Sequence, residues 1–399
     1  MAAAEDFLAS YKTDANSAVC FKLVTAENDI FDKGKEFHPE FSHQLFGDSE
    51  SIFGYKGLQV QLYSHAGSLL TYLGLTCESD VTGILEGIEP DPVLKIISER
   101  LSGGYLSNLD EFIAKLPSEN GFRPMGELIH SYKQNDADYE IYSADIFVPK
   151  FKEFYSRLQM FALWYIDGAS YLDFDDEKWQ FFLLFEKKNV CGEVQYSTVG
   201  YVTVYHFFAY PDQIRPRIGQ MLLLPPYQKQ GHGAELLRVV EEHYIKDPKV
   251  VDITVEDPSN SFLRLRDYVD SLACSKLECF SPDNLKKGFT DTLLREAKKA
   301  RKINKLQCRR VYEILRLKAT DRSNAKEYKE YRLDVKKRLN TSYQKEKSDF
   351  EKMKKYISAE ELSAMMNLQS TSERQKQLEQ IYEEVETSYL KTIERLAAS

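Results

Sequence analysis

Residues 220–237 read QMLLLPPYQKQGHGAELL: an apolar run, two prolines, a glycine-bearing turn and an amphipathic continuation. The segment IGQMLLLPPY (218–227) predicts a strand that ends at its prolines. The residues after the turn have the apolar spacing of a helix, at Leu236, Leu237, Val240 and Tyr244. A turn between a strand and a helix N-terminus points free backbone N–H groups at an anion, and glycines let the main chain approach a pyrophosphate. The stretch therefore predicts a phosphate-binding loop.

The spacing of the glycines distinguishes among the known types of phosphate-binding loop. QKQGHG fits the pattern Gln/Arg-x-x-Gly-x-Gly/Ala at Gln228, Gly231 and Gly233. The dinucleotide-binding fingerprint needs a third glycine that is missing here, and the Walker pattern needs Gly-Lys-Ser/Thr. Because so short a motif is common, its setting between a strand and a helix is what supports the interpretation.

Neighbouring segments predict a sheet around this loop. They are rich in aromatic and β-branched residues: WQFFLLFEKKN (179–189), VQYSTVGYVTVYHFFAYPD (194–212) and VVDITVEDP (250–258). The second is a strand or a strand pair broken at Pro211. Short strands such as GLQVQLYSH (57–65) alternate with turns in the preceding part of the chain.

The C-terminal part of the chain predicts helices only. Pro282 is the last proline and Gly288 the last glycine, so the remainder lacks both helix breakers. SPDNLKKGF opens this part with a serine cap and a proline at the first helical position, and SAEE (358–361) has the spacing of a capping box. We find no heptad pattern long enough for a coiled coil.

Composition excludes several classes of protein. The chain has 399 residues, 43% of them hydrophobic, which suits two or three folded domains. No apolar run approaches the roughly 18 residues of a membrane span, and the first residues do not resemble a secretory signal. The six cysteines have no CxxC spacing and no adjacent histidine cluster. We expect no metal site, no membrane partner, and a location in the cytoplasm, the nucleus or both.

The charge is distributed unevenly. Residues 286–399 contain 28 Lys and Arg against 18 Asp and Glu, so in a chain of net charge −9 the part before them carries −19. An acidic body steers a basic partner toward it, although a solvated acidic surface explains the charge equally well. The basic end fits a solvated bundle or a nuclear-import surface at KKARKINK (298–305). Its interleaved acidic residues argue against direct nucleic-acid binding.

Longer segments of the sequence resemble a known fold and a known family. The order strand, Gln-x-x-Gly-x-Gly, helix, strand resembles the Gcn5-related N-acetyltransferase fold, which binds acetyl-coenzyme A through its pyrophosphate. Four segments restrict the resemblance to one family within this fold: HQLFGDSESIFGYKGL (43–58), QMLLLPPYQKQGHGAELL (220–237), DITVEDPSNSFLRLRDYV (252–269) and RRVYEILRL (309–317). Together they resemble the family of type B histone acetyltransferase catalytic subunits, from about residue 20 to the C-terminus.

The resemblance implies an α+β fold in three domains. Residues 1–135 would form an α/β N-terminal domain with substrate-side contacts. Residues 136–273 would form the central mixed-sheet N-acetyltransferase domain that binds acetyl-coenzyme A, and residues 274–399 an all-helical C-terminal region.

It also implies site residues. The main chain of one strand segment would run beside the pantetheine arm, at Met221, Leu222 and Leu223. The pyrophosphate loop would be Gln228, Lys229, Gln230, Gly231, His232, Gly233 and Ala234. The carboxylates of proton transfer would be Glu256, Asp257 and Asp167, the last replacing the longer glutamate common in the family. Histone-contacting stretches align with Asp48, Ser49 and Glu50 and with Tyr205, His206 and Phe207.

The residues themselves leave alternatives open. Glu256 lies at a strand's end on the face opposite Val251, Ile253 and Val255, which suits a general base but also a surface carboxylate. Asp257, before Pro258 and a helical pattern, also fits a helix N-cap, which leaves Glu256 the better base. Asp167 also fits a turn-former, His232 a spacer between glycines, and His206 a core or groove residue.

The function that follows is lysine acetylation by direct attack, because no Cys–His or Ser–His constellation accompanies the loop. The resemblance implies free histone H4 as the substrate, together with histone H3, and a β-propeller histone chaperone as a partner. Two alternatives remain: an enzyme of the same fold that acts on protein N-termini or small amines, and a non-catalytic acyl-coenzyme A-binding adaptor.

Overall fold

The computed structural model describes residues 8–82, 87–173, 176–353 and 371–398. The chain divides into two compact units, each described here by itself. The first unit comprises Met1–Val240 and Thr254–Glu256, and the second comprises Glu241–Ile253 and Asp257–Ser399. The division falls inside helix α9 (His232–Ile245), so the helix that follows the glycine turn belongs to both units. The predicted domain boundaries at 135/136 and 273/274 stay predictions.

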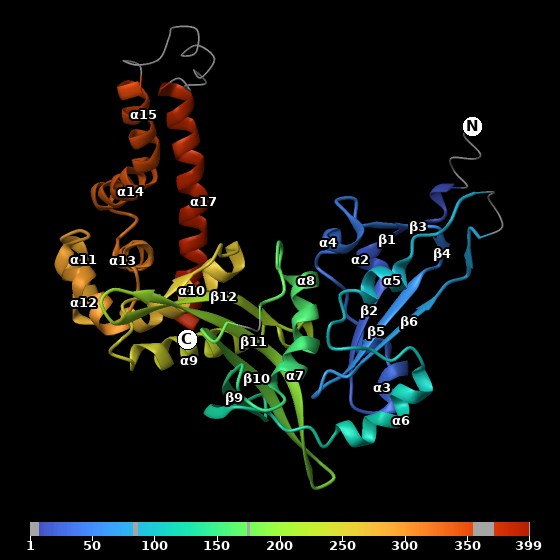
Figure 1. Cartoon of the computed structure of the whole chain (residues 1–399). Coiled ribbons are helices and arrows are strands. Elements are labelled where there is room, and N and C mark those ends of the chain that lie inside the picture. The colour runs from blue at the N-terminus through green and yellow to red at the C-terminus, as the bar shows by residue number, and fades with distance from the viewer. Residues whose placement is uncertain (1–7, 83–86, 174–175, 354–370, 399) are drawn as a thin grey trace. The chain divides into compact units, whose positions relative to one another are not determined.

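A six-stranded mixed sheet forms the centre of the first unit (Figure 1). The strands are β8 (Glu127–Gln134), β9 (Ala137–Asp145), β10 (Trp179–Val190), β11 (Glu193–Ala209), β12 (Gln213–Leu223) and β13 (Thr254–Val255). Their order is β13-β12-β11-β10-β9-β8, with every neighbouring pair antiparallel except β12–β13, which is parallel. The predicted central mixed sheet is confirmed, and 194–212 proves to be one strand that ends before the cis Tyr210–Pro211 bond.

The rest of the first unit surrounds this sheet. Its strands are β1 (Lys12–Asp14), β2 (Val19–Val24), β3 (Ser51–Phe53), β4 (Tyr55–Lys56), β5 (Gln59–His65), β6 (Thr71–Thr76) and β7 (Ser79–Asp80). Its helices are α2 (Ala15–Ala18), α3 (Glu27–Phe31), η1 (Lys33–Lys35), α4 (His43–Phe46), α5 (Val93–Ser98), α6 (Leu109–Glu119), α7 (Phe151–Leu158), η2 (Gln159–Phe161), α8 (Ala162–Tyr165) and η3 (Pro225–Tyr227). Strands β2, β5 and β6 form a three-stranded sheet, as the N-terminal α/β expectation requires.

Aromatic packing joins these parts into one core. On α7, Phe151 lies 4.6 Å from Phe181 of β10, measured between ring centroids. Phe21 of β2 lies 5.5 Å from Trp164 of α8 in an edge-on contact. Such pairs add about 0.5–1.5 kcal/mol each beyond the burial of their area. The N-terminal sheet and the central sheet therefore share a single hydrophobic cluster.

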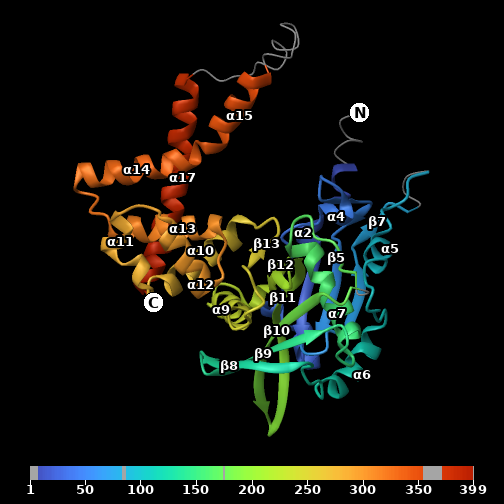
Figure 2. The same cartoon turned by 60° about the vertical axis from the view of Figure 1, so that its left-hand side comes forward.

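Helices make up nearly all of the described part of the second unit, and the described residues from 274 onward agree with the all-helical expectation for 274–399 (Figure 2). After α9 they are α10 (Asn260–Cys274), η4 (Glu278–Phe280), α11 (Pro282–Lys286), α12 (Asp291–Arg301), α13 (Lys305–Ala319), α14 (Ala325–Leu339), α15 (Thr341–Met353) and α17 (Thr371–Ala398). The predicted capping box at 358–361 lies outside the described residues. Within the described ranges, no helix combines the length and the apolar character that a membrane crossing needs.

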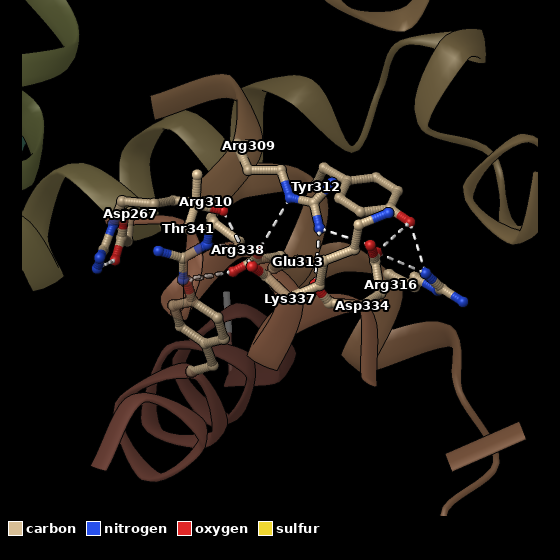
Figure 3. A network of polar contacts seen from close by, with 11 residues as sticks. Asp267, Arg309, Arg310, Tyr312, Glu313, Arg316, Asp334, Lys337, Arg338 and Thr341 are labelled. Carbon is tan, nitrogen blue, oxygen red and sulfur yellow. Dashed lines mark hydrogen bonds and ion pairs between the residues drawn. The ribbon is translucent and has the colours of Figure 1, made fainter. Parts of the chain in front are cut away.

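Buried ion pairs connect the helices of this unit (Figure 3). Glu313 of α13 is completely buried, and its carboxylate accepts hydrogen bonds from Arg309, Arg338 of α14 and Tyr389 of α17 at 2.7–3.0 Å. Arg310 of α13 forms an ion pair with Asp267 of α10. Part of the basic charge seen in the sequence therefore serves internal pairing and is not purely a solvated surface.

We expect Glu313→Gln to lower the free energy of unfolding by about 3 kcal/mol, because the change leaves the two partly buried guanidinium groups without their counter-charge. The measurement is urea unfolding followed by circular dichroism. Glu330→Gln, at an exposed position of α14, is the control and should change the free energy by less than about 0.5 kcal/mol. Equal midpoints for the two variants would contradict a central role for Glu313.

Candidate active site

Side-chain hydrogen bonds fix the shape of the glycine loop. The Gln228 amide donates to the carbonyl of Leu223 at 2.8 Å, and the Gln230 amide donates to the carbonyl of Pro226 at 2.8 Å. Gln134, from β8, donates to the carbonyl of Gln230. The loop is therefore held by the segment that precedes it and by the neighbouring β8–β9 hairpin.

The loop leaves a row of backbone donors free. Among the described residues, no hydrogen bond takes the backbone N–H groups of residues 229–233. Lys229 and Gly231 have φ of +59° and +100°, which turns the chain so that successive N–H groups converge. The positive end of the α9 dipole begins at the same place. Such donors suit a pyrophosphate, although the N–H groups of Gln228 and Ala234 already donate to the carbonyls of Pro225 and Gly231. The pyrophosphate-binding role of Gln228 to Ala234 stays a prediction.

We expect Gly231→Ala to weaken acetyl-coenzyme A binding roughly 10-fold, because a Cβ at φ +100° costs about 1–2 kcal/mol of backbone strain. The added Cβ itself would meet only Gln134, at 3.7 Å, so the effect comes from the backbone. Calorimetric titration measures the dissociation constant.

Gly192→Ala is the matched control, since Gly192 has φ +90° in the β10–β11 turn with nothing within 4 Å of an added Cβ. It should reduce stability without changing cofactor affinity. Equal affinities for the wild type and the Gly231 variant would contradict the loop assignment.

The strand before the loop offers a second set of backbone groups. Strand β13 pairs with β12 only at Arg217 and Ile218. From Gly219 to Leu223, no strand of the described chain pairs with that edge of β12. Met221, Leu222 and Leu223, predicted to follow the pantetheine arm, lie along this part of β12, where the Leu223 carbonyl already accepts the hydrogen bond of the Gln228 amide. An unpaired strand edge of this kind suits an amide-bearing chain.

His232 belongs to the packing beneath the loop. Its side chain is completely buried, its Nδ1 lies 2.8 Å from the Tyr132 hydroxyl, and its ring lies 4.3 Å from that of Tyr139. Burial lowers the pKa of His232, which favours the neutral ring. This placement agrees with a structural spacer that offers its backbone N–H, rather than its ring, to a ligand.

Glu256 stands at the end of β13 in an open position. Its backbone N–H donates to the carbonyl of Ile218 at 2.9 Å, and its side chain is 55% exposed. Its Oε1 lies 3.9 Å from a guanidinium nitrogen of Arg217 on β12. A carboxylate that is fixed through its backbone and accessible through its side chain can accept a proton from a substrate.

Asp257 is not the N-cap that its sequence context suggested. Helix α10 begins at Asn260, and the hydroxyl of Ser259 accepts the hydrogen bond of the Phe262 N–H at 3.2 Å. The cap therefore lies two residues after Asp257, which takes a left-handed φ of +30° with an exposed side chain. Its predicted catalytic role stays a prediction.

Asp167 lies in the turn after α8 and contacts a histidine. Its Oδ1 is 3.1 Å from Nε2 of His43, whose Nδ1 is 3.5 Å from Glu50. Glu50 also accepts the backbone N–H groups of Ser42 and His43 at 2.6 and 3.0 Å, and the Ser42 bond is the main reason that its pKa is lowered. The structure thus connects a predicted catalytic turn to the loop of Asp48, Ser49 and Glu50.

The three predicted contact residues of that loop differ in the exposure and in the hydrogen bonding of their side chains. Asp48 and Ser49 are exposed, and the Ser49 hydroxyl lies 2.8 Å from that of Ser51. The Glu50 carboxylate, in contrast, is engaged in holding the loop together. Asp48 and Ser49 are therefore the residues free to meet a peptide.

The second predicted contact stretch lies near the end of β11. Tyr205 and Phe207 share a face and meet edge-on at 4.6 Å, while His206 is half-buried. The Tyr205 hydroxyl donates to Asp176 at 2.7 Å. Asp176 also lines an open depression of about 610 Å³ together with Ile146, Phe147, Lys152, Asp173, Glu177 and Lys178.

Two residues of this region, Arg217 and His43, were not predicted from the sequence. Arg217 was missed because the apolar pattern placed the start of its strand at Ile218, whereas β12 begins at Gln213. His43 was missed because its contact with Asp167 joins segments far apart in the chain. The period-two alternation of β12 would have placed Arg217 on the same face as Met221.

Comparisons with known proteins agree with this geometry. Family models match three successive parts of the chain: "Histone acetyl transferase HAT1 N-terminus" over residues 11–167, "Acetyltransferase (GNAT) family" over 142–264, and "Histone acetyltransferase type B catalytic subunit, C-terminal" over 266–317. The histone acetyltransferase type B catalytic subunit of Homo sapiens is 44% identical, covering 99% of this chain and 96% of the relative. The chain belongs to the type B histone acetyltransferase catalytic subunit family.

A more distant relative is also named a histone acetyltransferase type B catalytic subunit. The Dictyostelium discoideum relative is 34% identical, covering 87% of this chain and 80% of its own length. Among solved structures, an aminoglycoside acetyltransferase from an uncultured soil metagenomic sample is 15% identical with a TM-score of 0.24, covering 30% of this chain and 78% of that one. That score is too low to support any argument.

Family membership makes the chain an acetyltransferase that uses acetyl-coenzyme A. The free donors of the loop and the open edge of β12 are consistent with that cofactor. In the described part of the chain, no cluster of three or more His, Cys, Asp or Glu residues is arranged to hold a metal ion.

Proposed function

We propose that this type B histone acetyltransferase transfers acetyl groups to lysines in the N-terminal tail of newly made, free histone H4. The observation that supports it most strongly is the coincidence of family membership with a free-donor loop and an accessible carboxylate in the same unit. Glu256 is the proposed general base.

The reaction requires a base because a lysine amine is nearly always protonated. With a pKa near 10.4, about one amine in 2,500 is neutral at pH 7, a deficit of roughly 4.6 kcal/mol. When bound, acetyl-coenzyme A supplies the acetyl group as an activated thioester. The Glu256 carboxylate, exposed at the end of β13, takes the amine proton directly or through one water as the nitrogen attacks the thioester carbonyl. The C–N bond forms, the C–S bond breaks, and coenzyme A leaves as its thiolate.

The cysteines support direct attack. Burial raises the pKa of Cys20 and Cys279 to about 11 and that of Cys308 to about 12, which keeps these thiols protonated. Cys274 is buried as well, whereas Cys77 is half-buried and Cys191 is exposed. The four buried thiols are therefore poor candidates for the nucleophile of a covalent acyl-enzyme.

Charge and aromatic surface suit a basic peptide. Residues 1–285 carry a formal charge of −19, which speeds the capture of a basic tail in a salt-dependent way. Asp48 and Ser49 are exposed, and Phe207 is 38% exposed beside Tyr205. These residues are the proposed histone contacts, with His206 behind them.

Partners and location are proposed from the family alone. Histone H3 would accompany H4, a β-propeller histone chaperone would present them, and the enzyme would work in both nucleus and cytoplasm. No membrane or direct nucleic-acid partner is proposed.

The substrate is tested by mass spectrometry of a mixture of free core histones after incubation with acetyl-coenzyme A. We expect acetyl groups mainly on H4 tail lysines, and far slower turnover of free lysine and polyamines. Equal turnover of all amines would contradict the histone substrate. Cofactor binding without any turnover would favour a non-catalytic adaptor.

The base is tested by Glu256→Gln. We expect the rate of acetylation to fall 10²–10⁴-fold, the range typical of a lost general base, with little change in acetyl-coenzyme A affinity. Glu127→Gln is the control, because it removes the same charge at an exposed position of β8 on the opposite edge of the sheet. A Glu256 variant as active as this control across the pH range would contradict the assignment.

A further inference from the structure

Three strands of the central sheet meet at Arg217. In register, it lies between Tyr205 of β11 on one side and Thr254 of β13 on the other. Because β13 pairs with β12 only there and at Ile218, Arg217 joins the strand of the proposed peptide contacts to the strand that ends in the proposed base.

The Arg217 side chain contacts a functional residue in each direction. Its guanidinium carbon lies 4.5 Å from the centre of the Phe207 ring, a cation–π distance. One of its terminal nitrogens lies 3.9 Å from Oε1 of Glu256. The Nε of Arg217 is buried and has no hydrogen-bond partner among the described residues. Neither contact therefore belongs to a network in which every donor of this guanidinium is satisfied.

A substrate amine can displace the contact between Arg217 and Glu256. The two side chains are 36% and 55% exposed, and 3.9 Å is beyond hydrogen-bond length. Exposed pairs of this kind are weak, so a substrate amine can approach Glu256 without a large loss. The arginine charge, however, stays beside the carboxylate, since a guanidinium does not lose its proton in proteins.

We propose that Arg217 is the positioning residue of the acceptor site: it holds a fixed positive charge between Glu256 and the proposed peptide contact Phe207, and this charge favours the neutral, reactive form of the acceptor amine. This inference rests on the proposed function, in which Glu256 is the base. The charged and titratable groups around it are Glu256 after β13, Arg215 on β12, Tyr205 on β11, and Asp176 and Lys178 before β10.

The positive charge of Arg217 shifts the pH dependence of the reaction rate in one direction. A positive charge lowers the pKa of a nearby amine. This change extends activity toward lower pH, because more of the acceptor amine is neutral. Removal of the charge therefore moves the acid limb of the rate profile to higher pH.

The test measures single-turnover rates against pH for wild type, Arg217→Gln and Arg217→Lys, with saturating acetyl-coenzyme A and an H4 tail peptide. For Arg217→Gln we expect the acid limb to move up by about 0.5–1 pH unit, the size of a unit charge about 6 Å away at high effective dielectric. The peptide KM should not rise, since the removed group repels a basic tail. Arg217→Lys should return the limb to its wild-type position.

A second substrate separates charge from structure. A peptide with S-aminoethylcysteine in place of the acceptor lysine has a less basic amine, because sulfur withdraws electrons. The rate deficit of Arg217→Gln should shrink on this peptide, whereas a loss caused by a distorted site would not. Arg123→Gln, the same substitution at an exposed loop position of the first unit, is the control.

An unshifted acid limb in Arg217→Gln, or an equal deficit on both peptides, would overturn the inference. Failure of the proposed function has a different signature, since Glu256→Gln would then keep the wild-type rate. The two failures are therefore distinguishable in one set of variants.

Discussion

The site depends on the point at which two parallel strands stop pairing. Strand β13 hydrogen-bonds with β12 at Arg217 and Ile218 and no further. Beyond that point β12 continues to Leu223 with an open edge and then enters the glycine loop. The backbone donors and acceptors of such an edge are satisfied by water or by another chain that pairs with it. The same interruption places Glu256 at the end of β13, beside Arg217.

The cofactor side of the site was predictable because its signals are local. A strand, a glycine turn and a helix follow one another within 220–237, and the structure has them in that order as β12, the loop and α9. The positive φ of Gly231 is what the motif requires of that position. Local backbone chemistry of this kind can be inferred from neighbouring residues alone.

The substrate side was less predictable because its contacts join distant segments. No periodicity reveals that Asp167 faces His43, or that Glu50 is engaged in its own loop. The N-cap expected at Asp257 was wrong because Ser259, two residues later, provides the better oxygen for the Phe262 N–H. The basic C-terminal region gave no hint that Glu313 is buried among arginines, since ion pairing of that kind depends on tertiary packing.

Amide hydrogen exchange can show whether the backbone N–H groups of the glycine loop bind the cofactor. Exchange of the amides of residues 229–233 should be measured with and without saturating acetyl-coenzyme A, with the β10–β11 turn at Gly192 as an internal reference. We predict slower exchange at 229–233 on addition of the cofactor and no change at the reference, because these amides have no acceptor of their own among the described residues. Unchanged exchange at 229–233 in the presence of bound cofactor would contradict the account.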